Sequence, residues 1–222
     1  MEIVLAKKIL KANDQIAAAN RGALERARIL AVNLVGSPGA GKTALLEALI
    51  PSLKGRFRLA VVEGDLATSL DAERIEAAGA RSIQINTEGG CHLDASMVGQ
   101  ALGALDLESI DILFIENVGN LVCPAGFDLG ERLRVVVLSV AEGDDKAAKY
   151  PPIFQNAQAV ALNKIDLIEH TDFNRERFRD RLARLSRDVR VFELSAKTAQ
   201  GVPGFADWLG DQRRRLLEET KE

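Results

Sequence analysis

One glycine-rich octapeptide constrains what this chain can fold into more than any other part of the sequence. It stands between an apolar, β-branched run at 29–35 and a helix-like segment at 44–53. Its residues are Gly36, Ser37, Pro38, Gly39, Ala40, Gly41, Lys42 and Thr43. The order matches the GxxxxGK(S/T) phosphate-binding loop in its strand-loop-helix setting, and so many consecutive matches disfavour a plain glycine-rich turn. The loop is therefore expected to hold a nucleotide phosphate.

Each part of this loop has an expected role. Its backbone N–H groups can face a β-phosphate at the positive end of the helix. Lys42 should reach the β- and γ-phosphates, and the Thr43 hydroxyl should bind Mg²⁺. A second Mg²⁺ contact is expected from Asp65 or Glu116, since each ends an apolar run. Either acid could instead be a helix cap or a solvated strand end. Lys42, Asp65 and Glu116 are the expected catalytic residues. Asp65 would either orient the attacking water or act as a Mg²⁺ ligand.

Six more apolar runs follow the first and alternate with amphipathic segments. The runs lie at 58–62, 82–86, 110–115, 133–140, 157–162 and 189–194, and further helix-like segments lie at 69–78, 94–105, 172–186 and 203–216. Continuous apolar runs are typical of strands that are covered on both faces. The alternation predicts an α/β P-loop NTPase fold, with a mostly parallel central sheet of about seven strands and helices on both faces.

Composition places the chain among ordinary globular proteins. It has 222 residues, 47% of them apolar, and a net charge of −3. We expect residues 1–28 to form a helical extension packed on the domain, with a possible break near 20–22, and residues 29–222 to form one nucleotide-binding domain. No basic run is longer than Arg213 to Arg215, which argues against nucleic acid. No membrane span or secretory signal is recognisable, so a cytoplasmic location is expected.

Two later motifs indicate which base is bound. Asn163, Lys164 and Asp166 end one apolar run as Asn-Lys-x-Asp, and Ser195, Ala196 and Lys197 end the next. A carboxylate at Asp166 can accept the N1–H and the exocyclic amine of guanine, a pair that adenine does not offer. Alone, Asn-Lys-x-Asp could be a simple turn. In this order after a phosphate loop, it favours a guanine nucleotide over ATP.

The stretch that should sense the γ-phosphate lacks one common catalytic residue. Gly119, in Glu116 to Asn120, can donate its N–H to a γ-phosphate, but no water-positioning glutamine follows it. Catalysis would then depend mainly on Lys42 and Mg²⁺, so turnover of the isolated protein is expected to be slow.

The few metal-binding side chains stand beside these segments. Cys91 and His92 follow one apolar run, and Cys123 lies four residues past Gly119. Thiolate and imidazole suit Zn²⁺, and also Ni²⁺. The plainer interpretation is two buried thiols and a surface histidine. Three ligands do not close a tetrahedral site, but two chains on a two-fold axis would supply six.

Taken together, the motifs resemble the hydrogenase nickel-incorporation GTPases (HypB-like), within a class of dimerising metallochaperone GTPases. The resemblance covers the chain from Leu30 to about Gly204. It rests on the phosphate loop, 63–65, 90–95, 116–125, 142–146, 149–151, 163–166 and 195–197. The urease accessory GTPases (UreG-like) typically have Cys-Pro-His where this chain has Cys91-His92, and lack a cysteine like Cys123. The hydrogenase branch is therefore favoured.

This resemblance implies a set of functional properties. It implies GTP binding and hydrolysis, nucleotide-dependent dimerisation, and Ni²⁺ or Zn²⁺ held by Cys91, His92 and Cys123. It also implies transfer of nickel to the large-subunit precursor of nickel-iron hydrogenase together with a small zinc-binding partner of the HypA type. This chain has neither an N-terminal cysteine-rich motif nor a histidine-rich tract. Nickel storage is therefore not expected.

Two other functional classes stay open at this point. One is a GTP-dependent recruitment switch whose metal only stabilises the dimer. The other is a small-molecule kinase with the same phosphate loop, which the guanine motifs disfavour. If nucleotide orders 116–120, it also positions Cys123, so the nucleotide state could control metal release.

Overall fold

A seven-stranded, entirely parallel sheet forms the centre of the molecule. The computed structural model describes the backbone of residues 2–65, 70–87 and 89–220, and their side chains except those of 2–9, 65 and 70. The strands are β1 (Leu30–Val35), β2 (Leu59–Asp65), β3 (Arg81–Asn86), β4 (Ile112–Glu116), β5 (Leu133–Ser139), β6 (Ala159–Asn163) and β7 (Arg190–Glu193). Their order is β3-β2-β4-β1-β5-β6-β7, with every neighbouring pair parallel. The predicted α/β fold is confirmed.

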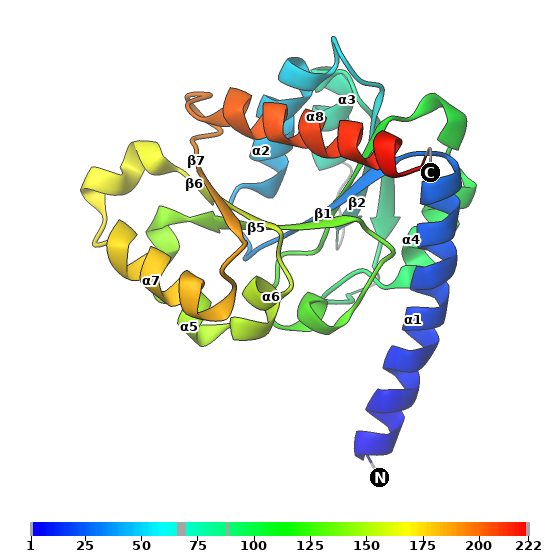
Figure 1. Ribbon diagram of the computed structural model, residues 1–222, viewed down its shortest axis with the longest axis horizontal. Helices are drawn as coiled ribbons and strands as arrows, with labels where there is room; N and C mark the ends of the chain where they lie inside the picture. Colours follow the sequence, from blue (N-terminus) through cyan, green and yellow to red (C-terminus); the bar gives the residue numbers. More distant parts are fainter. Residues whose placement is uncertain (1, 66–69, 88, 221–222) are drawn as a thin grey trace.

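Helices cover both faces of this sheet (Figure 1). One face carries α2 (Lys42–Leu53), α3 (Leu70–Ala78) and α8 (Val202–Glu219). The other carries α1 (Glu2–Arg26), α4 (Ala95–Gly103), α5 (Lys146–Lys149), α6 (Pro151–Gln155) and α7 (Arg175–Leu185). Short 3₁₀ turns lie at Leu107–Ser109, Cys123–Gly126, Val140–Glu142 and Ile165–His170. No helix among the described residues has the length and apolar character needed to cross a bilayer.

The apolar runs form strands because both of their faces are covered. Every residue of β1, β4, β5 and β6 is buried, whereas the edge strands β3 and β7 are partly exposed. Alternate side chains enter opposite layers, so that Val135 packs toward α2 and α8 while Val136 packs toward α6 and α7. The hydrophobic cores therefore fix which face each helix occupies.

The N-terminal helix differs from the expectation in one respect. The possible break near 20–22 is wrong, because α1 runs without interruption from Glu2 to Arg26. Gly22 lies within this helix, and a glycine in a helix interior costs about 1 kcal/mol of stability relative to alanine. Burial of the neighbouring Asn20 and Leu24 against the domain offsets that cost. The N-terminal end of α1 projects away from the body, and its C-terminal half lies along α4 (Figure 1).

Candidate nucleotide and metal site

The phosphate-binding loop takes the backbone shape that the motif predicts. It joins β1 to α2, and Gly41 at the start of α2 has a φ of 93°. A Cβ at Gly41 would lie 2.5 Å from Asn163 Nδ2. A side chain here would therefore strain the backbone and also displace the amide of Asn163. The loop is shaped jointly by its own glycines and by the end of β6.

A cavity of about 420 Å³ adjoins this loop. Its lining includes Lys42 and Thr43 from α2, Glu116 at the end of β4, and Gly119 just beyond. Asn120 N–H donates to Gly36 O at 2.9 Å, so the segment after β4 is tied to the start of the phosphate loop. The residues expected to contact the phosphates therefore meet at one cavity.

Glu116 is a buried acid at this cavity, and its pKa is strongly raised. Its carboxyl accepts from the Thr43 hydroxyl at 2.8 Å, while its other oxygen, Oε2, is buried without a partner among the described residues. Burial raises the pKa of Glu116 to about 7, against the opposing effects of Lys42 and Thr43. Burial also lowers the pKa of the Lys42 ammonium. A hard cation would satisfy both the unpartnered oxygen and the adjacent hydroxyl, so these two side chains fit Mg²⁺.

Asp65 was the other acid expected to bind Mg²⁺. It ends β2, where its backbone is paired in register with Asn86 of β3. Its side chain lies outside the described residues, as does the segment 66–69. The role of Asp65 in orienting water or Mg²⁺ therefore stays a prediction.

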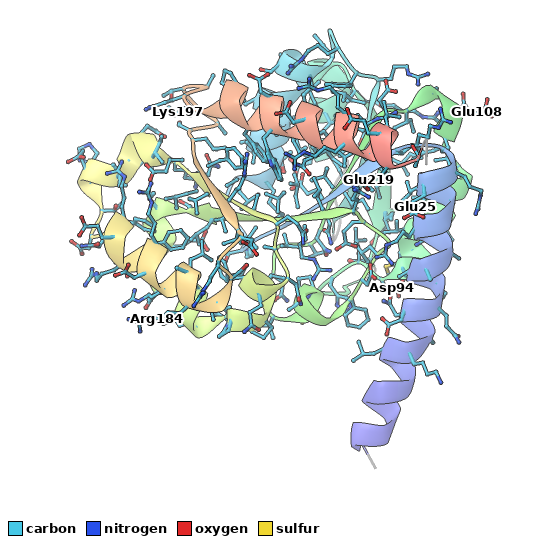
Figure 2. All side chains as sticks on the ribbon, viewed as in Figure 1. Glu25, Asp94, Glu108, Arg184, Lys197 and Glu219 are labelled. Atoms are coloured by element: carbon cyan, nitrogen blue, oxygen red, sulfur yellow. The ribbon has the colours of Figure 1, made fainter. Side chains whose placement is uncertain are left out.

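A second cavity, of about 570 Å³, adjoins the first and shares Gly41 and Ala44 with it. It is lined by Asn163, Lys164 and Asp166 from the end of β6 and by Ala196 and Lys197 after β7. Lys197 lies on the loop that precedes α8 (Figure 2). Both base-recognition motifs thus border one space beside the phosphate cavity.

The side chains of the first motif are held by hydrogen bonds to both loops. Asn163 Nδ2 donates to Ala40 O at 3.0 Å, and its Oδ1 accepts from Ala196 N at 3.0 Å. Lys164 Nζ donates to Gly39 O at 2.7 Å, which lays its stem beside the phosphate loop. These contacts tie the loops after β6 and β7 to the phosphate loop.

The second motif orients the carboxylate of the first. The Ser195 hydroxyl donates to Asp166 Oδ1 at 2.5 Å. Two backbone N–H groups of the Ser195 to Lys197 turn already donate within the protein, from Ser195 to Gln200 O and from Ala196 to Asn163. Among the described residues the Lys197 N–H has no such partner. It is therefore the N–H of this turn best able to meet a base carbonyl.

Cys91, His92 and Cys123 come together in space, although 32 positions separate the two cysteines. Their possible ligand atoms all lie within 4.8 Å of one another, and Cys91 Sγ is 3.4 Å from His92 Nδ1. A hydrogen bond with Cys123 raises the pKa of the Cys91 thiol, and burial lowers the pKa of the His92 imidazole. Proximity of this kind is what a soft or borderline metal ion needs, and binding would replace the thiol protons.

Several residues at these sites carry no motif and were missed by sequence reasoning. Arg74 of α3 lines the phosphate cavity and pairs with Glu47 at 2.6 Å and with Asp71 at 2.6 Å. The ring of Phe127 lies 4.0 Å from that of His92, between centroids. Such residues carry no sequence signal, because only the tertiary structure brings them to the site.

A parallel sheet with a phosphate loop after β1 and an acid at the end of β4 defines a P-loop nucleotide-binding protein. Residues 30–193 match the family described as CobW/HypB/UreG, nucleotide-binding domain. The chain is 52% identical over 219 residues to the hydrogenase maturation factor HypB of Rhizobium leguminosarum bv. viciae, spanning 99% of this chain and 73% of that protein. The chain therefore belongs to the HypB family of hydrogenase maturation factors, which confirms the resemblance seen in its motifs.

Solved structures agree with this assignment. The crystal structure of HypB from Helicobacter pylori in complex with nickel has a TM-score of 0.88 and 38% identity, and covers 92% of this chain and 96% of that one. That of HypB from Archaeoglobus fulgidus has a TM-score of 0.85 and 36% identity, and covers 91% of this chain and 99% of that one. The fold is therefore shared along nearly the whole chain.

The raised pKa of Glu116 predicts a pH-dependent penalty in the protein without metal or nucleotide. Between about 4.5 and 7 the unfolded chain has lost this proton while the folded protein keeps it, so the stability of the folded state falls as pH rises through this window. Glu116→Gln removes the titration. In EDTA, the free energy of unfolding of the variant minus that of the wild type should rise by on the order of 3 kcal/mol from pH 4.5 to 8.

Urea unfolding at a series of pH values measures this difference. Glu108→Gln, at an exposed turn, serves as the control and should show no comparable trend. A pH-independent difference between Glu116→Gln and the wild type would contradict the prediction.

Proposed function

We propose that this protein is a GTP-binding and GTP-hydrolysing nickel metallochaperone for the maturation of nickel-iron hydrogenase. The observation that carries the proposal is the cluster of Cys91, His92 and Cys123 beside a nucleotide cavity, with ligand atoms within 4.8 Å of one another. The nickel complex of the Helicobacter pylori relative supports nickel as the cargo. The names of the relatives support hydrogenase as its destination.

Guanine is the base that the second cavity suits best. Asp166 is held by Ser195 at the edge of that cavity, where its carboxylate can accept the N1–H and the amine of guanine. The Lys197 N–H can donate to the guanine O6, and the Lys164 stem can cover the base. These donors and acceptors are complementary to guanine and would be mismatched with adenine.

For hydrolysis, the chain supplies positive charge and a cation site at the phosphates. Lys42 would neutralise the β- and γ-phosphates, and the Gly119 N–H would donate to the γ-phosphate. Thr43 and Glu116 would hold Mg²⁺, which when bound neutralises charge on the phosphate oxygens. Asp65 is proposed as a further Mg²⁺ contact or as the residue that orients water. With no glutamine after Gly119, slow intrinsic turnover is expected.

The metal site needs more ligands than one chain brings together. Cys91, His92 and Cys123 are the cluster of this kind among the described residues. A tetrahedral site needs a fourth ligand, so we propose that a homodimer formed on GTP binding shares the metal, either Ni²⁺ or Zn²⁺. A small zinc-binding chaperone of the HypA type and the hydrogenase large-subunit precursor are the proposed partners. A cytoplasmic location stays a prediction.

A buried amide offers a physical route from nucleotide to metal. Asn117 directly follows Glu116, and its Oδ1 accepts from Leu93 N at 3.0 Å, next to His92. Its Nδ2 donates to Asn33 Oδ1 at 3.4 Å, and Asn33 in turn donates to Glu131 at 3.1 Å. A shift of Asn117 when the γ-phosphate leaves would therefore reach the backbone beside His92. We propose that hydrolysis loosens the metal site in this way.

Asp166→Asn tests the base assignment. An asparagine amide can donate to the carbonyl that xanthine carries in place of the guanine amine, so preference should move from GTP to xanthosine triphosphate by at least about tenfold. Competition binding measures both affinities. Asp172→Asn, at an exposed position outside this cavity, should leave them unchanged. Unaltered GTP affinity in Asp166→Asn would contradict the assignment of guanine as the bound base.

Cys91→Ser and Cys123→Ser separate a metallochaperone from a recruitment switch. Each variant removes a thiolate ligand, so nickel binding at this site should be lost while GDP affinity is retained. Nickel titration, sizing with a non-hydrolysable GTP analogue and a hydrogenase maturation assay are the measurements. A metallochaperone should then fail in maturation even where the dimer forms. Full maturation by a dimer that binds no metal would establish the recruitment switch instead.

Asn117→Ala tests the coupling. In the wild type, nickel affinity should differ between the GTP-analogue and GDP states, and the variant should reduce that difference because the link to Leu93 is gone. Isothermal titration in both states gives the coupling, with the exposed Asn156→Ala as the matched control. Identical nickel affinities in the two states of the wild type would count against coupling altogether.

A further inference from the structure

The buried face of α1 carries amides where a helix normally presents apolar side chains. Asn13, Ala17, Asn20 and Leu24 recur at helical spacing, and each is at most 6% exposed. Burial of an amide is costly unless its hydrogen bonds are made. The burial of the two asparagines therefore depends on the groups that satisfy their hydrogen bonds.

Each asparagine bridges the same two loops. Asn13 accepts from Ala95 N at 2.9 Å and donates to Asp128 O at 2.8 Å. Asn20 donates to Ala95 O at 2.8 Å and to Leu129 O at 3.0 Å. Arg21 adds a two-pronged contact to the Asp128 carboxylate at 2.7 and 2.8 Å. One helix thus binds both backbone groups of Ala95 and two adjacent carbonyls of the other loop.

These bridged positions lie at the ends of the loops that bear the metal-binding side chains. Ala95 is three residues after His92, at the start of α4, and the neighbouring Asp94 lies beside α1 (Figure 2). Asp128 is five residues after Cys123 and directly follows Phe127, whose ring packs on His92. The distance between the two loops is therefore set where α1 holds them.

The close approach of α1 to the second loop depends on a glycine. Gly130 has a φ of 94°, and a Cβ there would lie 2.7 Å from Ala17 O. The helix backbone consequently rests directly on the loop after Cys123. Such a contact leaves little freedom for that loop to move without α1.

We propose that α1 is a positioning element for the metal site, in which Asn13 and Asn20 hold the Cys91–His92 loop and the Cys123 loop at the separation that metal binding requires. This role rests on the proposed metal function of those ligands. It gives the N-terminal helix a role independent of nucleotide contact, since none of the described side chains of α1 lines the phosphate or base cavity. Loss of a hydrogen-bonding partner that orients a metal ligand commonly changes metal affinity by about 10- to 100-fold, and Asn13 and Asn20 would act one step further away, through the backbone of the ligand-bearing loops.

Asn20→Ala and Asn13→Ala test this role in the whole 222-residue chain, loaded with GDP, with nickel alone as the probe. Each variant should weaken nickel binding by about tenfold or more and alter the thiolate-to-nickel absorption band, because the loops are no longer held in register. GDP affinity should be unchanged. Gln15→Ala, on the exposed side of the same helix, is the matched control and should bind nickel like the wild type.

The outcomes separate this role from the metal site itself. If Cys123→Ser keeps wild-type nickel binding, the proposed metal site fails. If Cys123→Ser loses nickel but both asparagine variants keep wild-type affinity and spectrum, α1 has only a structural role and the inference is overturned, even if their thermal stability falls. Should Asn20→Ala not fold, Asn13→Ala decides, since it leaves the bonds of Asn20 in place.

Discussion

The parallel direction of all seven strands is the constraint on which the site depends. Because every strand points the same way, the loops after β1, β4, β6 and β7 leave the sheet at one edge. The phosphate loop, the Glu116 segment and both base loops are brought together there from positions as distant as 36 and 197. Asn163 illustrates the result, since it ends β6 and yet hydrogen-bonds to the phosphate loop after β1. No loop has to travel far to reach the nucleotide cavities.

Buried polar groups then decide how these loops are held. Asn33, Asn117 and Glu131 are each at most 9% exposed, and each is hydrogen-bonded within one connected network. Glu131 also accepts from Leu129 N at 2.8 Å and from Arg134 at 2.7 Å. In a low-dielectric interior an unmade hydrogen bond costs about 1–3 kcal/mol, so few alternative loop arrangements compete. Glu116 is one exception at the phosphate cavity, because its Oε2 lacks a partner among the described residues and burial raises its pKa to about 7. This unpartnered oxygen lies where a bound cation would satisfy it.

The strands could be predicted because a strand buried on both faces consists of a continuous run of apolar residues. The longer helices could be predicted, within a few residues of their ends, because burial of one face gives an apolar repeat at helical spacing. The short α5 and α6 were not expected, because helices of four and five residues show no periodicity. Their placement follows instead from packing, with Ile153 and Phe154 buried in the core shared with α7. Likewise, Gly22 reads locally as a break, but tertiary packing of its neighbours keeps α1 continuous.

By itself, the sequence predicted the class of this protein and its candidate chemistry: the phosphate loop, the guanine-type motifs, the scarce thiols and the strand-helix alternation of an α/β domain are all local patterns. It also predicted that Cys91 and Cys123 lie near segments expected to sense the nucleotide. What only the tertiary structure decided is distance: that three ligand atoms lie within 4.8 Å, that Asn117 touches the loop of His92, and that Asn13 and Asn20 bridge residues 75 to 115 positions away. Hydrogen bonds of this kind join groups without any periodic signal, so they become visible only when the chain has folded.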